Sequence, residues 1–176
     1  MNNIILKSDN ISDLQIKNAL IQSLSNLNKK LKKVLLLPPD ITRFHSQGGK
    51  ITAMYYDLLK DTCQVDIMPA IGTHMPMTHE EIEIMFGKDI PKERFIVHDW
   101  KNDIVKIGQV PGTYIREVSE GFLDFSIDVE VNRRLVNSEY DLIISIGQVV
   151  PHEVVGMANY NKNIFVGCGG KSMIDS

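Results

Sequence analysis

The sequence predicts an α/β fold of the Rossmann-like kind, with a mostly parallel sheet and helices on both faces. Three apolar runs, at residues 34–37, 65–71 and 141–147, suit buried parallel strands, which are usually continuous hydrophobic stretches. Each run stops at a proline or a glycine, which ends a strand and turns the chain. Segments with helical spacing of apolar residues lie between the runs, and this alternation is typical of βαβ units.

An amphipathic helix is predicted over residues 12–32. Ser12 and Asp13 can cap its first turn, and leucine or isoleucine then recurs at helical spacing. The strand at 34–37 follows, and residues 51–59 predict a second helix after a glycine turn.

A third helix is predicted from Thr78 to Phe86, after the strand at 65–71. Thr78 and Glu81 match a capping box, in which two side chains satisfy free amides at the start of a helix. Gly87 then ends the helix.

The second half of the chain is less regular. Besides the buried strand at 141–147, residues 95–98 and 163–167 predict two further strands. Residues 103–115, which contain a Pro-Gly turn, predict a β-hairpin or edge strands. The pattern of residues 128–135 fits either a helix or an extended edge segment.

Bulk composition restricts the classes of function. The 176 residues are enough for a single α/β domain over residues 1–176, and 43% are hydrophobic. Nineteen basic against twenty-two acidic residues predict no nucleic-acid partner, because such surfaces need a basic excess. We expect no membrane partner, because no apolar run approaches the roughly 20 residues of a membrane span. The first residues lack the pattern of a signal peptide, so we expect a cytoplasmic protein.

Polar side chains follow several of the predicted strands. Asp40 and Arg43 follow the first strand, His74 follows the second, and His152 follows the strand at 141–147. Parallel strands end at one edge of a sheet, so these groups should converge on an open polar cleft. Two imidazoles in one cleft can serve as acid and base near neutral pH. Arg43 can bind a carboxylate, or it can form a loop ion pair with Asp40.

Other polar positions are less specific. Lys162 can hold a phosphate or act as a covalent anchor, although a solvated loop lysine is the usual case. Cys63 suits the core, and Cys168 suits a tight turn in the glycine-rich segment 167–171. The chain contains no His-x-x-x-His, cysteine cluster or Asp-x-Asp motif, so the sequence predicts no metal site built from side chains alone.

Taken together, these segments resemble the N-terminal domain of the nickel-dependent lactate racemase family. The resemblance rests on residues 39–43 (PDITR), 72–78 (GTHMPMT) and 150–152 (VPH), followed by Lys162, in the family's order. It implies a nickel-pincer nucleotide, a pyridinium-derived cofactor that binds nickel through carbon and sulfur atoms. Such a cofactor explains how a metal enzyme lacks a side-chain metal cage.

The resemblance also implies a role for each site residue. His74 and His152 would be the catalytic acid and base, and Lys162 would hold the cofactor covalently through a thioamide. Asp40 and Thr42 would bind the cofactor. Arg43 would bind the substrate.

The implied reaction is racemisation or epimerisation of a 2-hydroxy acid such as lactate. One histidine removes the hydroxyl proton while the C2 hydrogen leaves as hydride to the cofactor, and the planar keto acid is then reduced from either face. The partners would be a small 2-hydroxy acid and the cofactor-synthesis enzymes. We expect the chain to be the N-terminal catalytic and cofactor-binding part of a longer racemase-like protein, and to contain no nickel and show no activity alone.

Two departures from the family's pattern keep an alternative open. A Ser-Gly-Gly-rich stretch before the lysine is replaced by residues 158–161 (ANYN), and no histidine follows His152 as a nickel ligand. A binding domain that keeps the fold and an anion pocket but has lost the cofactor would show such changes. A Rossmann-like oxidoreductase with a free nicotinamide cofactor is disfavoured, because no Gly-x-Gly-x-x-Gly follows a strand.

Overall fold

Three parallel strands form the centre of the fold. The computed structural model describes residues 3–152 and 156–174. β1 (Lys33–Leu37) lies between β2 (Gln64–Ile67) and β5 (Leu142–Ser145), and both pairings are parallel. The valine and leucines of β1 are fully buried, because packed layers cover both faces of this strand. The predicted α/β class with a parallel sheet is therefore confirmed.

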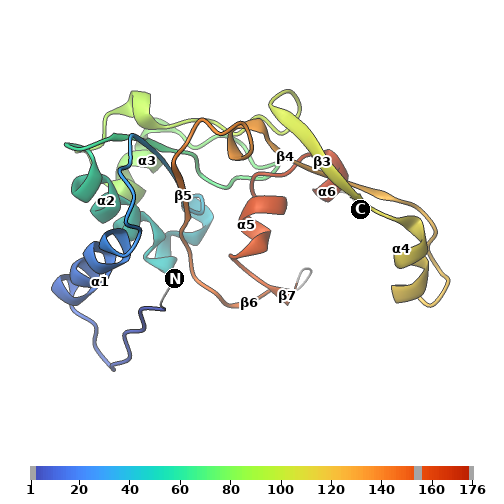
Figure 1. Cartoon of the computed structure of the whole chain (residues 1–176), viewed down its shortest axis with the longest axis horizontal. Helices are drawn as coiled ribbons and strands as arrows, with labels where there is room; N and C mark the ends of the chain where they lie inside the picture. The colour runs from blue at the N-terminus through green and yellow to red at the C-terminus, as the bar shows by residue number, and fades with distance from the viewer. Residues whose placement is uncertain (1–2, 153–155, 175–176) are drawn as a thin grey trace.

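Three α-helices pack on one face of the sheet. They are α1 (Asp13–Ser25), α2 (Gly48–Leu59) and α3 (His79–Phe86), which gather on one side of the sheet in Figure 1. Ser12 caps α1 and Thr78 caps α3, each in a complete capping box. The first helix is shorter than predicted and ends at Ser25.

Short elements cover the opposite face. The 3-10 helix η3 (Arg133–Leu135) contributes Leu135, and Cys168 comes from the turn after α5 (Asn161–Phe165). Cys168 belongs to the buried cluster that includes Leu35 and Leu37 of β1, and Leu135 packs against this cluster.

A two-stranded arm extends away from the sheet (Figure 1). β3 (Ile104–Val110) pairs antiparallel with β4 (Ile127–Asn132), and α4 (Gly112–Val118) lies between them in sequence. The predicted hairpin strand over residues 103–115 is therefore right for β3, whereas the predicted Pro-Gly turn begins a helix.

The remaining elements are short. They are the 3-10 helices η1 (Ile41–Ser46) and η2 (Lys92–Arg94), the hairpin of β6 (Pro151–His152) with β7 (Gly156–Met157), and the last helix α6 (Lys171–Ile174). Within the described ranges, no helix combines the length and the apolar character needed to cross a membrane.

Two predicted strands are wrong. Residues 95–98 form a single parallel bridge, between Phe95 and Ile67, before the chain leaves the sheet. Residues 163–167 belong mostly to α5 and the turn after it. A short apolar run fits a buried helix as well as a strand, and here the tertiary contacts select the helix.

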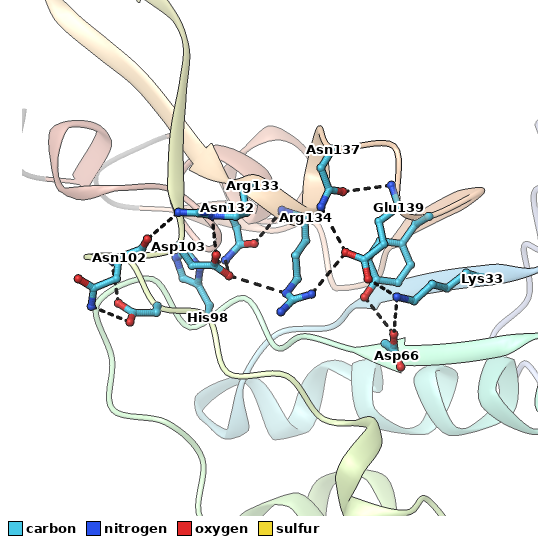
Figure 2. Close-up of polar contacts among 12 residues, drawn as sticks. Lys33, Asp66, His98, Asn102, Asp103, Asn132, Arg133, Arg134, Asn137 and Glu139 are labelled. Atoms are coloured by element: carbon cyan, nitrogen blue, oxygen red, sulfur yellow. Dashed lines mark hydrogen bonds and ion pairs between the residues drawn. The ribbon is translucent and has the colours of Figure 1, made fainter.

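A chain of ion pairs joins the sheet to the root of the arm (Figure 2). Lys33, at the amino end of β1, pairs with Glu139 and lies 3.7 Å from Asp66. Arg134 lies 3.4 Å from Glu139 and 3.7 Å from Asp103, next to β3. Lys33 lies at the amino end of β1, whereas sites in parallel sheets lie at the carboxyl ends of the strands.

Candidate functional site

A cavity of about 260 Å³ lies at the carboxyl edge of the sheet. The segments that follow β1, β2 and β5 all contribute to its wall, as the topology of a parallel sheet predicts. Six residues singled out from the sequence line this one cavity: Asp40, Thr42, Arg43, His74, His152 and Lys162.

Asp40 is the most constrained of these residues. It follows β1 through Pro38 and Pro39, and it is only 5% exposed. Its Oδ1 accepts hydrogen bonds from the backbone N–H of Thr42, at 3.1 Å, and from the Thr42 hydroxyl. Asp40 thereby caps η1, because its carboxylate satisfies a free amide at the start of that helix.

The second carboxylate oxygen of Asp40 contacts His74. Asp40 Oδ2 lies 2.6 Å from His74 Nδ1, a hydrogen bond at the short end for a nitrogen donor and a carboxylate. Asp40 therefore pairs with His74 and not with Arg43, so the loop ion pair left open by the sequence is not observed.

A glycine turn places His74 at the cavity. Gly72 has φ of +56°, a conformation that costs glycine little, and its N–H donates to the Gly167 carbonyl at 2.8 Å. The N–H of His74 donates to the Ile71 carbonyl at 2.9 Å and closes the turn. The imidazole remains 62% exposed on the cavity side.

Arg43 presents an available positive charge. Its side chain is half-buried in the cavity wall. Within residues 3–152 and 156–174, its guanidinium has no hydrogen bond or ion pair. Guanidinium groups bind carboxylates through paired N–H donors, so Arg43 is suited to an anionic ligand.

Lys162 lines the cavity from the first turn of α5, after an unusual turn. Asn159 and Tyr160 have φ of 62° and 49°, values that glycine adopts far more readily than other residues. Asn159 Nδ2 donates to the Gly147 carbonyl at 2.9 Å, and Asn163 Nδ2 donates to the Ile146 carbonyl at 3.2 Å.

Asn159 and Asn163 were not predicted as site residues from the sequence. Both tie the segment after β5 to α5, and both line the cavity. For Asn159, the sequence signal was that asparagine replaces a residue of a glycine-rich stretch, because asparagine tolerates positive φ best after glycine.

The remaining histidines lie outside the cavity lining. His45 is exposed, and His79 pairs with Glu83 on the surface of α3. His98 is 2% exposed, and burial lowers its pKa below the usual value. His98 is therefore a core histidine.

The glycine-rich segment 167–171 serves close packing. A Cβ on Gly169 would lie 1.9 Å from the Phe165 carbonyl oxygen, so only glycine fits there. Burial raises the pKa of the Cys168 thiol to about 12, which leaves it protonated and unreactive at neutral pH. Cys63 packs at the edge of the core, as expected.

The described residues contain no group of three or more histidine, cysteine, aspartate or glutamate side chains placed to hold a metal ion. The amine, guanidinium, imidazole and amide groups of the cavity wall suit an anionic organic ligand.

The fold and this strand-end site define a family. The family model described as the lactate racemase N-terminal domain matches residues 7–176. The chain therefore belongs to the lactate racemase N-terminal domain family, and the resemblance seen in the sequence motifs is confirmed.

Two relatives and one solved structure show how far the similarity extends. A lactate racemase of Lactiplantibacillus plantarum is 34% identical over 107 residues, which cover 59% of this chain and 22% of the relative. A lactate racemase of Thermoanaerobacterium thermosaccharolyticum is 28% identical over 149 residues, covering 82% and 32%. A crystal structure of a Thermotoga maritima protein matches with a TM-score of 0.81 and 29% identity, covering 97% of this chain and 41% of the other. The chain thus spans less than half the length of each.

Proposed function

We propose that this chain is the catalytic and cofactor-binding part of a racemase or epimerase that acts on a small 2-hydroxy acid. The observation that carries the proposal is that His74 and His152, which follow different strands, line one cavity together with Arg43 and Lys162. The names of the relatives, both lactate racemases, support the substrate class.

The two histidines meet the acid–base requirement of a racemase. Each enantiomer of a 2-hydroxy acid presents its hydroxyl group from a different side, so each needs its own base. In our proposal, one imidazole accepts the hydroxyl proton of one enantiomer, and the other imidazole donates a proton when the opposite enantiomer forms. His74 Nε2 is the ring nitrogen that does not contact Asp40, and it is the proposed atom that accepts the proton.

Arg43 is the proposed carboxylate-binding residue. An ion pair with two parallel hydrogen bonds would fix the orientation of the acid relative to the histidines. The cavity volume of about 260 Å³ lies just below the roughly 300–1,000 Å³ of typical ligand pockets, which suits a small acid beside the reactive part of a cofactor.

The cavity wall also suits the nickel-pincer nucleotide implied by the family. Lys162 is the proposed covalent anchor, and Asp40 and Thr42, at the start of η1, are the proposed contacts. The cofactor, when bound, supplies an acceptor for the hydrogen on C2 and brings carbon and sulfur ligands for nickel. These ligands come from the cofactor, so nickel would be held without a metal-binding cluster of side chains, and the described residues contain none.

Substitution of the histidines tests the proposal. The protein should contain this domain in a chain of racemase length and be produced together with the cofactor-synthesis enzymes. His74→Ala and His152→Ala should each lower kcat/KM for racemisation by roughly 10²-fold or more, the scale of a lost acid–base group. Because the equilibrium constant of a racemisation is one, both directions should fall equally.

His45→Ala is the matched control, since His45 is exposed and outside the cavity lining. It should keep the activity of the parent protein. Near-normal rates in both directions for either cavity variant would show that the substituted histidine has no catalytic role.

A second candidate is a binding domain that has lost the cofactor. The observation that favours it is the positive φ of Asn159 and Tyr160, where the family's pattern has glycines that adopt this conformation without strain. The two candidates differ in one measurable property, which is whether Lys162 acquires a covalent adduct.

A further inference from the structure

A buried carboxylate, a threonine and an exposed imidazole form a hydrogen-bonded series at the cavity wall. Thr42 donates to Asp40 Oδ1 through its N–H, at 3.1 Å, and through its hydroxyl. Asp40 Oδ2 lies 2.6 Å from His74 Nδ1. We propose that Asp40, oriented by Thr42, is a positioning residue that keeps neutral His74 in the tautomer with the proton on Nδ1.

The direction of the hydrogen bond follows from the chemistry of the groups. An ionised carboxylate accepts hydrogen bonds and has no proton to donate, so His74 Nδ1 must be the donor. A neutral imidazole carries one N–H only, and a proton on Nδ1 leaves the lone pair on Nε2. Nε2 belongs to a ring that is 62% exposed at the cavity, whereas the Asp40 side chain is 7% exposed.

The Asp40 carboxylate is held in place from several directions. It follows the fully buried end of β1 and two prolines, which restrict the backbone. It also caps η1 through the Thr42 amide, so a change in its rotamer would leave that amide without its acceptor. A buried carboxylate with these fixed donors can orient the imidazole more narrowly than a mobile surface carboxylate could.

The catalytic consequence rests on the proposed function. As the substrate O–H bond breaks, the proton binds to His74 Nε2 and the electron pair stays on the substrate oxygen. The ring then carries a positive charge, which the Asp40 carboxylate stabilises at 2.6 Å without taking the proton. When the reaction runs in the reverse direction, the same Nε2–H returns the proton and re-forms the first enantiomer.

The tautomer can be measured on the 176-residue chain without cofactor. Nitrogen-15 chemical shifts of the imidazole rings, recorded at a pH where they are neutral, distinguish Nδ1–H from Nε2–H. We expect His74 of the wild-type chain to be mainly Nδ1–H. His45, whose ring makes no hydrogen bond to the described residues, is the internal reference and should show the Nε2–H form that free imidazoles prefer.

Asp40→Asn is the decisive variant. The amide keeps the shape of the carboxylate and can still accept from Thr42 through its oxygen, but it presents an NH₂ donor to Nδ1. His74 should therefore switch to Nε2–H, which cannot accept a proton at the cavity. In racemase-length protein, kcat should then fall by roughly 10²- to 10⁴-fold with a smaller change in KM.

Thr42 supplies a matched pair of variants. Thr42→Ser keeps the hydroxyl donor and should keep the wild-type tautomer. Thr42→Val removes the donor and should lower the Nδ1–H population relative to Thr42→Ser.

The outcomes separate this inference from the proposed function. If His74 of the wild-type chain is in the Nε2–H form, the positioning role is overturned, even in an active racemase. This measurement uses the wild-type chain, so it does not require that any variant folds. A tautomer switch in Asp40→Asn without a change in an active enzyme's kcat would overturn the catalytic consequence. A clear Nδ1–H signal in a protein without racemase activity would support the positioning role and contradict only the proposed function.

Discussion

Lys162 reaches the cavity because two strained residues turn the chain in front of it. Positive φ in a non-glycine residue costs on the order of 1–3 kcal/mol, and Asn159 and Tyr160 adopt it in succession. The side-chain bonds of Asn159 to Ser145, at the end of β5, and to Gly147 offset part of this cost. A strained turn that is held by specific bonds and carries a cavity lysine is typical of a functional position.

We predict that Lys162 is the site of covalent cofactor attachment. The chain produced with the cofactor-synthesis enzymes should gain mass in intact-protein mass spectrometry, and Lys162→Ala should abolish the gain. Lys171→Ala is the matched control, because Lys171 is exposed and outside the cavity lining. An adduct that survives Lys162→Ala would show that the cofactor is attached to another residue. If no variant carries an adduct, the result would favour the alternative of a binding domain that has lost the cofactor.

Among the elements, the arm is the part least supported by the core. Every residue of β3 and α4 is half-buried or exposed, and Phe122, which follows α4, is 86% exposed. A two-stranded ribbon is marginally stable without a further layer. The root of the arm is different, because Val131 bridges to Gly169 and Asn132 donates to the Cys168 carbonyl at 2.7 Å.

The arm should therefore open locally while the sheet stays folded. In native-state hydrogen exchange of this chain, the paired amides near Val110 and Ile127 should exchange roughly 10²-fold or more faster than those of β1. Amides near Val131 should exchange at intermediate rates. Equal protection of the arm tip and β1 would show that the arm is stabilised by contacts beyond those of the described fold.

At the scale of the whole molecule, His98 joins three regions. Its Nε2 donates to the Gly169 carbonyl at 3.0 Å, and its Nδ1 accepts from Asn132 Nδ2 at 3.0 Å. The ring thus links the segment after η2 to the root of the arm and to the turn before α6. Both nitrogens are satisfied only in the neutral form, because a proton on Nδ1 would face the Asn132 donor.

This arrangement predicts that the free energy of unfolding falls in mild acid. Burial lowers the pKa of His98 in the folded chain below its usual value near 6.5, so the unfolded chain binds a proton that the folded chain does not. The stabilisation from neutral His98 is fully present above pH 6.5 and is lost as the pH falls from there toward the folded pKa.

Denaturant unfolding of wild type and His98→Gln between pH 7.5 and pH 5 would measure the effect. The variant should be less stable at pH 7.5 but lose less stability on acidification. His45→Gln, at an exposed position, should keep the wild-type pH dependence. An unchanged slope in His98→Gln would assign the acid sensitivity to other groups.

Local pattern determined much of this molecule in advance. The apolar runs of β1 and β5, the capping boxes at Ser12 and Thr78, and the polar residues after each strand could all be read from neighbouring positions. These features depend on residues close in sequence, and parallel strands bring their carboxyl ends to one edge in any such fold. The convergence of the candidate site residues on one cavity followed from that rule.

Only the tertiary structure decided which partners meet across the fold. Asp40 could be expected to pair with Arg43, three residues away, but β2 lies beside β1 and brings His74 to its carboxylate. Residues 163–167 have the composition of a strand, yet the Asn163 amide bonds to the Ile146 carbonyl and α5 packs where the glycines allow close approach. Both outcomes depend on contacts between distant residues, whose energies are set by strand order and packing and cannot be read from a local pattern.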